Sequence, residues 1–319
     1  MRKILMLDRE TLGNDIDVSP FAAHGELFIN PVTPKKKVAE EIKDAEVLIL
    51  NKVFLNEENL KTAKNLKLIC LLATGYNNID TDYCKKNNIA VCNVPGYSTK
   101  SVAQHTFAMA LSLIENIALY DNHVKSGAYA NGDTANYLGW PYYNLDGKTW
   151  GIIGLGNIGK EVAKIASAFG CDVLYYSTSG KNNNSEYKSV SLKELLSKSD
   201  VVSLHCPLNE VTDNLITYKE LSEMKPSSII VNVARGRNIN EKDLAKALKE
   251  NIIGGACIDV YENEPPRPDS PILDKEIAHK LILTPHIAWA SVEARNSLVT
   301  KICENIESFY NGGNLNRVV

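Results

Sequence analysis

Three side chains suited to acid–base chemistry each follow a strand-like run in the C-terminal half of the chain. Arg235 follows IIVNVA, Glu264 lies in YENEPP after ACIDV, and His286 follows LILTP. The carboxyl ends of parallel strands meet at one edge of an open α/β sheet, and ligands bind beyond that edge. We therefore expect an arginine, a glutamate and a histidine to converge on one site, with Glu262 as a second carboxylate nearby.

Such a set suits the reduction of a 2-keto acid, which needs a hydride at the carbonyl carbon and a proton at the carbonyl oxygen. A histidine can donate that proton because it titrates near neutral pH, and a carboxylate partner favours its protonated form and fixes the ring. An arginine fork can bind the substrate carboxylate and polarise the carbonyl. The structural alternative is a surface ion pair between Arg235 and Glu264.

The other histidines compete for the proton-donor role. They are His24, His105, His123, His205 and His279. His205 also ends a strand-like run, in LHCPLNEVT, and we expect it beside a cofactor rather than in proton transfer. His105 lies within a long helical stretch, where a packed structural histidine is expected.

A glycine-rich turn in WGIIGLGNIGKEVAKIASAFG predicts a dinucleotide-binding unit. Gly154, Gly156 and Gly159 form a GxGxxG pattern between a strand-like run and a helical run. The first glycine makes the tight turn, the second lets the backbone approach a pyrophosphate, and the third lets helix and strand pack closely. The N–H groups that open the helix, at Asn157 and Ile158, can bind the phosphates. The alternatives are a tight turn without a ligand and a methyltransferase-type loop.

The next strand-like run, DVLYY, ends without the acidic residue that commonly holds the ribose of NAD. Ser177 occupies that position, and Asp172 lies at the opposite end of the run. Ser177, Thr178, Ser179 and Lys181 can donate hydrogen bonds to a 2′-phosphate, and no carboxylate repels it. We therefore expect NAD(P)H as the cofactor, with NADPH preferred. The alternative is that these are ordinary loop residues and that NAD binds without its usual ribose anchor.

Strand-like and helical runs alternate along the chain, which is typical of parallel sheets covered by helices. The expected strands are residues 3–7, 47–50, 66–73, 89–94, 149–153, 172–176, 201–204, 229–233, 256–260 and 281–284. The expected helices are residues 99–120, 157–169, 191–198, 218–223, 240–250 and 291–311. Irregular or exposed loops are expected at residues 126–147 and 181–188.

Length and composition favour a two-domain protein without nucleic-acid or membrane partners. The chain has 319 residues and a net charge of −3, which gives no basic surface for nucleic acid or an acidic membrane. The N-terminal apolar run is too short for a signal peptide, and the apolar stretch at 68–73 is too short for a membrane span. Seven scattered cysteines without a CxxC pair indicate reduced thiols, a cytoplasmic location and no metal site.

Five motifs in order resemble the D-isomer-specific 2-hydroxyacid dehydrogenases over essentially the whole chain. They are GIIGLGNIG, LHCPLNEVTDNLI, MKPSSIIVNVARG, GGACIDVYENEPP and LTPHIAWAS. The resemblance implies that Arg235 in NVARG, Glu264 before proline and His286 in TPH are the catalytic residues. It also implies that Asp259 contacts the nicotinamide amide and that backbone N–H groups near Gly75, in ATGYNNID, bind the substrate carboxylate.

These observations together define the candidate sites. The candidate cofactor-binding residues are Gly154, Gly156, Asn157, Ile158, Gly159, Ser177, Thr178, Ser179, Lys181, His205, Pro207, Thr212, Ala234 and Asp259. The candidate substrate-binding residues are Thr74, Gly75, Tyr76, Arg235 and His286.

The resemblance further implies two doubly wound parallel-sheet α/β domains. Residues 1–99 with 287–319 would form a flavodoxin-like substrate-binding domain, and residues 100–286 a Rossmann NAD(P)-binding domain. The long helix and the loop after it are implied to build a homodimer.

Three segments resemble the glycerate dehydrogenase or hydroxypyruvate reductase branch: NVPGYSTKSVAQHT, GWPYYNLDGKTWGIIG and HIAWASVEAR. The expected reaction is therefore reduction of hydroxypyruvate or glyoxylate to D-glycerate or glycolate. One alternative is a bulkier 2-keto acid. Another is a non-catalytic NAD(P)-sensing protein, which the intact Arg235, Glu264 and His286 disfavour. Trp289 and Trp140 either line the substrate pocket or pack as ordinary core residues.

Overall fold

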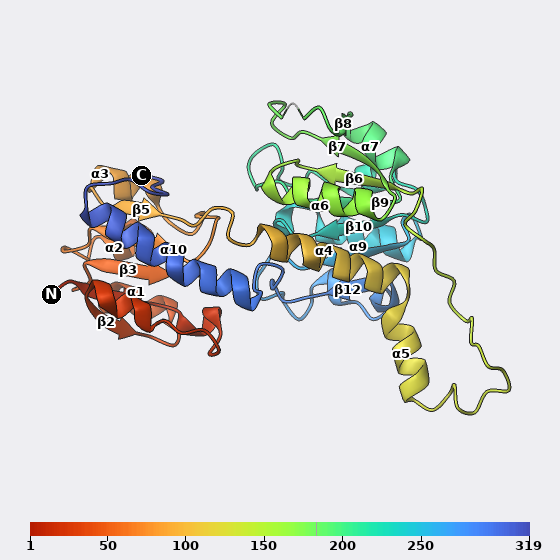
Figure 1. The fold of residues 1–319 in the computed structure, drawn as a ribbon, viewed down its shortest axis with the longest axis horizontal. Coiled ribbons are helices and arrows are strands. Elements are labelled where there is room, and N and C mark those ends of the chain that lie inside the picture. Colours follow the sequence, from red (N-terminus) through yellow and green to blue (C-terminus); the bar gives the residue numbers. More distant parts are fainter. Residues whose placement is uncertain (183) are drawn as a thin grey trace. The chain divides into compact units, whose positions relative to one another are not determined.

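The computed structural model describes residues 1–182 and 184–319, and the chain folds as two compact units (Figure 1). Unit 1 comprises Met1–Ser98 and Ala290–Val319, and unit 2 comprises Thr99–Trp289. Each unit contains one parallel β-sheet flanked by helices. The predicted fold class, two parallel-sheet α/β domains, is therefore confirmed.

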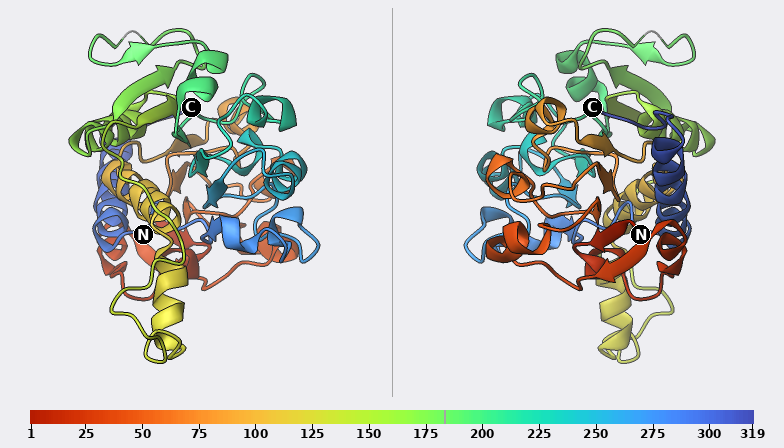
Figure 2. Two further views of the ribbon diagram at one scale, coloured as in Figure 1. Left: turned by 90° about the vertical axis from the view of Figure 1, so that its right-hand side faces the viewer. Right: turned by 90° about the vertical axis from the view of Figure 1, so that its left-hand side faces the viewer.

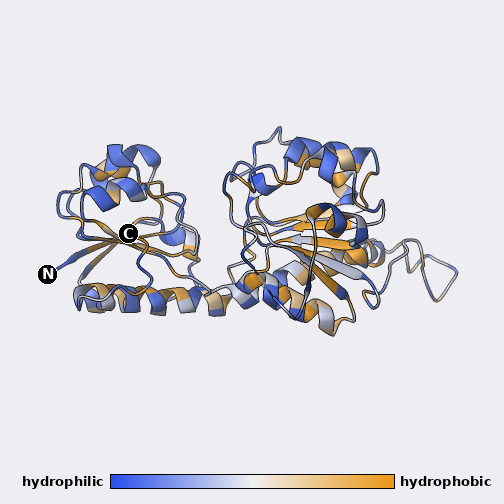
Figure 3. Ribbon diagram, turned by 90° about the horizontal axis from the view of Figure 1, so that it is seen from above, coloured by the Kyte–Doolittle hydropathy of each residue, from blue (hydrophilic) through white to orange (hydrophobic). Residues whose placement is uncertain are grey.

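Unit 1 is built on a five-stranded parallel sheet in the order β2-β1-β3-β4-β5. The strands are β1 (Lys3–Met6), β2 (Glu26–Ile29), β3 (Val47–Leu50), β4 (Leu68–Leu71) and β5 (Ala90–Cys92). The helices are α1 (Val38–Glu41), α2 (Glu57–Leu60), α3 (Thr81–Lys86) and α10 (Val292–Tyr310). Figure 3 shows α10 along one face of this sheet, with the shorter helices on the other face.

Strand β2 is absent from the elements that the sequence predicts. It pairs only with β1, at the edge of the sheet, and none of its residues is buried. Phe28 and Ile29 are both substantially exposed. An edge strand without a buried face lacks the hydrophobic alternation that marks other strands, and this explains why it was missed.

Unit 2 is built on a seven-stranded parallel sheet in the order β12-β11-β10-β9-β6-β7-β8. The strands are β6 (Thr149–Ile153), β7 (Asp172–Tyr176), β8 (Lys188–Ser189), β9 (Val201–Leu204), β10 (Ile229–Asn232), β11 (Gly255–Ile258) and β12 (Leu281–Leu283). The helices are α4 (Thr99–Ile114), α5 (Ile117–Lys125), α6 (Asn157–Ala168), α7 (Leu192–Lys198), α8 (Tyr218–Leu221) and α9 (Glu241–Lys249). The short edge strand β8 begins at Lys188, the last residue of the stretch 181–188 that was expected as a loop; residue 183 of that stretch lies outside the described residues.

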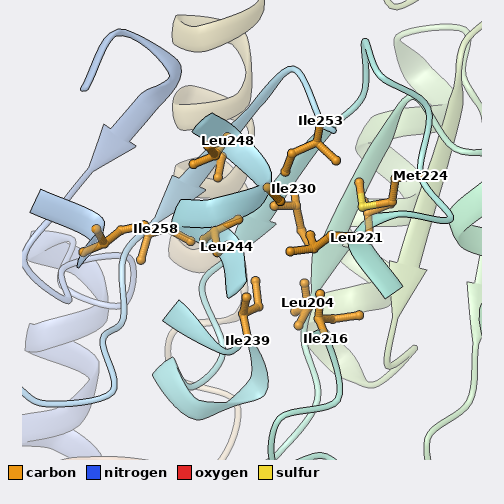
Figure 4. Packing of buried hydrophobic residues seen from close by; sticks show 14 of the residues in the cluster. Leu204, Ile216, Leu221, Met224, Ile230, Ile239, Leu244, Leu248, Ile253 and Ile258 are labelled. Carbon is orange, nitrogen blue, oxygen red and sulfur yellow. The ribbon is translucent and has the colours of Figure 1, made fainter. Parts of the chain in front are cut away.

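Successive side chains of the buried strands in this sheet pack against opposite helical layers. Ile230 belongs to the cluster formed with α7, α8 and α9, whereas its neighbour Val231 belongs to the cluster formed with α4 and α6. Figure 4 shows the first cluster, with Ile230 packed among Leu221, Leu244 and Leu248. Burial on both faces is why these strands read as nearly continuous apolar runs.

The long helix expected at residues 99–120 is instead two helices. Helix α4 ends at Ile114, and α5 begins at Ile117, because Asn116 adopts a left-handed conformation with φ of 55°. Asparagine tolerates this conformation better than most residues, and it breaks the helix. Helix α5 and the irregular loop after it project from the body of unit 2 (Figure 2).

No helix among the described residues is long and apolar enough to cross a membrane.

Candidate active site

The turn after β10 carries Arg235, and two buried asparagines hold its backbone. Asn232 Oδ1 accepts a hydrogen bond from Ala234 N at 3.1 Å, and Asn232 Nδ2 donates to Arg235 O at 2.9 Å. Asn238 Oδ1 accepts from Arg235 N at 3.1 Å. The half-buried Arg235 side chain donates to Ala234 O at 2.7 Å. The guanidinium is therefore presented by a fixed turn rather than by a mobile loop.

Gly236 brings this turn against the segment that carries the glutamate. A Cβ atom at position 236 would lie 1.9 Å from the carbonyl carbon and oxygen of Tyr261, so only glycine allows this approach. Tyr261 N in turn donates to Glu264 Oε1 at 3.2 Å. The backbone around Arg235 thus contacts the backbone of Tyr261, whose N–H in turn orients the Glu264 carboxylate.

Glu264 and His286 form a short hydrogen bond. The distance between Glu264 Oε2 and His286 Nδ1 is 2.6 Å, and the two side chains are 34% and 24% exposed. A carboxylate accepts here, so Nδ1 carries the proton and proton exchange with a ligand falls to Nε2. This pair is the arrangement that a general acid and its orienting carboxylate require.

His286 is held in a backbone conformation that non-glycine residues rarely adopt. Its φ is 56°, in the left-handed region. His286 N donates to Asp259 O at 2.8 Å and to Thr284 O at 3.1 Å, and Trp289 Nε1 donates to His286 O at 2.9 Å. Such conformations persist where surrounding contacts impose them, and they are frequent at functional sites.

Asp259 is almost fully buried, with 1% exposure, and its carboxylate binds the turn around His286. Thr284 Oγ1 donates to Oδ1 at 2.6 Å, Ile287 N donates to Oδ1 at 2.9 Å, and Ala288 N donates to Oδ2 at 2.9 Å. In this structure the carboxylate is engaged with the chain itself, and its contact with a nicotinamide amide stays a prediction.

The glycine-rich turn fits a dinucleotide. Gly154 has a φ of 94°, and a Cβ there would lie 3.0 Å from His205 C and Cys206 N. A Cβ on Gly159 would lie 2.3 Å from Gly154 O, so this glycine is required for packing. A Cβ on Gly156 would meet no protein atom within 4 Å, and Gly156 offers no side-chain cap to the N-terminus of α6. The open space and uncapped helix start suit a pyrophosphate.

His205 follows β9 and presents a buried nitrogen beside this turn. Trp150 Nε1 donates to Ser203 Oγ at 2.9 Å, and Ser203 Oγ lies 3.0 Å from His205 Nε2. The buried hydroxyl has one proton to donate, and donating it to Nε2 places the ring proton on Nδ1. His205 Nδ1 is buried without a hydrogen-bond partner in the described part of the chain, and burial lowers the pKa of His205 to about 3. A neutral histidine with an unsatisfied N–H suits a polar ligand.

The segment after β7 folds back on the glycine-rich turn. Ser177 Oγ accepts from Asn182 N at 3.4 Å, and Ser179 Oγ accepts from Lys181 N at 3.3 Å. Asn182 Nδ2 donates to Leu155 O within the turn. Asn182 was not among the predicted site residues, and the run of asparagines after the strand is the only sequence feature that marks it.

Of the remaining candidates for the cofactor site, Thr212 and Ala234 are buried and Pro207 is exposed, all in turns of unit 2. Thr212 Oγ1 donates to Pro207 O at 2.6 Å, and Asn238 Nδ2 donates to Thr212 O at 3.0 Å. Ala234 is buried next to Arg235. These contacts make the segment after β9 and the segment after β10 one hydrogen-bonded layer at the same edge of the sheet.

Two tryptophans considered for the substrate pocket lie in different surroundings. Trp289 packs against the α4 and α6 cluster and bonds to the His286 backbone. Trp140 lies in the loop after α5, with its ring centroid 5.1 Å from that of Tyr120 and 5.9 Å from that of His123.

The predicted substrate loop lies in unit 1, after β4. Thr74 Oγ1 donates to Val94 O at 2.9 Å, and Asn93 Nδ2 donates to Thr74 O at 2.7 Å. The backbone N–H groups of Gly75 and Tyr76 make no hydrogen bond within the described residues. They are therefore able to bind an anion such as a carboxylate.

The structure brings Arg235, Glu264 and His286 to the carboxyl ends of three adjacent strands, β10, β11 and β12. The glycine-rich turn and His205 follow β6 and β9 at the same edge of the parallel sheet. Sequence reasoning missed the residues that support this set. They are Asn232, Asn238, Asn182, Thr284 and, as a hydrogen-bonding residue, His105.

Comparison with known proteins agrees with this geometry. The sequence profile of the NAD-binding domain of D-isomer specific 2-hydroxyacid dehydrogenases matches residues 107–288. The chain is 35% identical to the glycerate dehydrogenase of Methylorubrum extorquens over 98% of this chain and 97% of that protein. It is 36% identical to the hydroxypyruvate reductase of Blautia hydrogenotrophica over 99% of both chains.

A solved structure extends the similarity to three dimensions. An acyclic imino acid reductase, determined in complex with NADPH and D-Arg, superimposes with a TM-score of 0.89 at 31% identity, covering 99% of this chain and 100% of that chain. The chain therefore belongs to the D-isomer specific 2-hydroxyacid dehydrogenase family.

Proposed function

We propose that this protein reduces small 2-keto acids, hydroxypyruvate or glyoxylate, to D-glycerate or glycolate with NAD(P)H. The observation that carries the proposal is the 2.6 Å hydrogen bond between Glu264 and His286. These residues follow β11 and β12, at the same edge of the sheet as Arg235 after β10 and His205 after β9. The relatives named glycerate dehydrogenase and hydroxypyruvate reductase support the choice of a small substrate.

The proposed roles follow from the chemistry of each side chain. When bound, the reduced nicotinamide supplies the hydride. His286 Nε2 donates the proton to the substrate oxygen, and Glu264 stabilises the charged imidazole and fixes its orientation. Arg235 binds the substrate carboxylate and polarises the carbonyl. We assign unit 2 to the dinucleotide, and unit 1 to the substrate through the N–H groups of Gly75 and Tyr76.

We further propose that NADPH is preferred over NADH. The segment after β7 carries hydroxyl groups and Lys181 and no carboxylate at Ser177, so it offers donors to a 2′-phosphate without repelling it. The imino acid reductase was solved with NADPH. The unpaired Nδ1 of His205 and the open space over Gly156 are the other contacts that we assign to the cofactor.

The proposed assembly is a homodimer formed through α5 and the loop after it. Leu138 is 84% exposed, and Val124, Tyr142 and Tyr143 are more than half exposed on this projecting segment. A second copy would remove this apolar surface from water.

The proposed location is the cytoplasm. All seven cysteines are free thiols, which supports a reducing compartment.

Replacement of His286 tests the reaction. His286→Ala should lower kcat/KM for hydroxypyruvate with NADPH by about 10²–10⁴-fold, the usual contribution of general acid catalysis. The measurement is the loss of absorbance at 340 nm with hydroxypyruvate, glyoxylate and 2-ketoisocaproate in parallel. His279→Ala, at an exposed histidine, is the matched control and should retain wild-type rates.

Three outcomes contradict parts of this proposal. Unchanged turnover in His286→Ala would remove its role as proton donor. Fastest turnover of 2-ketoisocaproate by the wild-type protein would indicate a bulkier substrate. NADPH binding without turnover of any acid would favour a sensor.

Gly156→Ala tests cofactor binding at the glycine-rich turn separately from the stability of the fold. Because the added methyl group meets no protein atom, the melting temperature should stay within about 2 °C of the wild-type value, while NADPH binding by fluorescence titration weakens at least tenfold. Gly159→Ala is the contrast, since its methyl group collides with Gly154 O and should lower the melting temperature. Wild-type affinity in Gly156→Ala would argue against a dinucleotide at this turn.

Ser177→Asp tests the basis of cofactor choice. A carboxylate at the end of β7 should repel the 2′-phosphate and bind the ribose hydroxyls, so the ratio of NADPH to NADH affinity should fall by more than tenfold. Ser177→Asn, of similar size but neutral, should preserve the ratio. If the ratio is the same in the aspartate variant, position 177 does not set the preference.

A further inference from the structure

We infer that His105 and Thr284 are positioning residues, which orient His286 by fixing the Asp259 carboxylate beneath its turn. The inference rests on the proposed function, because it assigns a purpose to a hydrogen-bond network behind the proposed proton donor. The network runs from His105 on α4, through Thr284 directly after β12, to Asp259 directly after β11.

The direction of each hydrogen bond in the network follows from its distances. Thr284 has one hydroxyl proton, and its Oγ1 lies 2.6 Å from Asp259 Oδ1 but 3.6 Å from Met109 Sδ. The short contact to a buried carboxylate is by far the stronger, so the proton goes to Asp259. Thr284 Oγ1 must then accept from His105 Nε2, 3.1 Å away, and this fixes the tautomer of His105 with the proton on Nε2.

This network orients the carboxylate that shapes the catalytic turn. With Thr284 bound to Oδ1, Asp259 directs its two oxygens to Ile287 N and Ala288 N. The backbone of Asp259 accepts from His286 N. The turn from 284 to 288 therefore closes around one buried side chain, and His286 is forced into its left-handed conformation.

His105 connects the turn to a rigid element. It lies on α4, whose apolar residues, including Phe107 and Met109, belong to the buried cluster on one face of the sheet. Its Nε2 lies 3.8 Å from Asp259 Oδ1, beyond hydrogen-bond distance, so it acts on that carboxylate through Thr284. Helix α4 thus fixes the position of the turn 284–288. The position of this turn in turn sets how the His286 ring lies against Glu264.

Thr284→Val and Thr284→Ser test this inference as a pair. Valine keeps the shape of threonine but removes the hydroxyl, whereas serine keeps the hydroxyl. We expect Thr284→Val to lower kcat for hydroxypyruvate by about 10- to 100-fold, the size expected when a reacting group is misplaced by a fraction of an ångström to an ångström. Thr284→Ser should restore kcat to within threefold of the wild-type value.

A measurement without substrate or cofactor keeps this test separate from the proposed function. The ring N–H proton that His286 shares with Glu264 should give a downfield proton NMR signal, assigned by its loss in Glu264→Gln. In Thr284→Val this signal should shift or broaden, and in Thr284→Ser it should return. His105→Gln, which keeps an N–H donor, should disturb the signal less than His105→Leu.

Each outcome has a defined meaning. An unchanged NMR signal and unchanged kcat in Thr284→Val would overturn the inference. Equal losses of melting temperature, NADPH affinity and kcat in both Thr284 variants would show a general structural role and would overturn it too. If the wild-type protein reduces no 2-keto acid but the signal responds as expected, the network positions His286 and the proposed function fails.

Discussion

The hydrogen bond between Glu264 Oε2 and His286 Nδ1 is the interaction on which the site depends. It commits Nδ1 to the carboxylate and so assigns proton exchange to Nε2. The bond joins the segment after β11, where Tyr261 N donates to Glu264, to the turn after β12, which closes around Asp259. Gly236 lets the Arg235 turn approach the first of these segments. Forming each turn costs conformational entropy of the backbone. Buried Asn238 holds the Arg235 turn, and buried Asp259 holds the turn that carries His286.

The order of the strands explains why these turns lie beside the glycine-rich turn after β6. The chain leaves β6 for β7 and β8 on one side and returns to β9 through β12 on the other, so the strand order reverses next to β6. At such a reversal the connecting helices leave on opposite faces and a crevice opens at the carboxyl edge. Gly154 and His205 flank this point, and Arg235, Glu264 and His286 follow along one side.

Most of this arrangement was predictable from sequence, because the buried strands of unit 2 read as apolar runs and the chemical residues follow them directly. The edge strand β2 was not predictable, because it lacks a buried face. The break between α4 and α5 was not predictable either, because it depends on the left-handed backbone of a single residue, Asn116. The residues that support the site through hydrogen bonds were not predictable from sequence either. Thr284, Asn238 and Asn182 act through hydrogen bonds to residues distant in sequence, and no local pattern encodes those partners.

The most direct test of the account is the pH dependence of kcat/KM for hydroxypyruvate reduction by the wild-type protein and Glu264→Gln. The carboxylate orients the imidazole and stabilises the positive charge it carries as the proton donor, so its removal should lower kcat/KM across the measured pH range. Because reduction consumes a proton from His286, activity in both proteins should fall as pH rises. Superimposable profiles, or activity in Glu264→Gln equal to that of the wild-type protein, would contradict the central role of the Glu264–His286 pair.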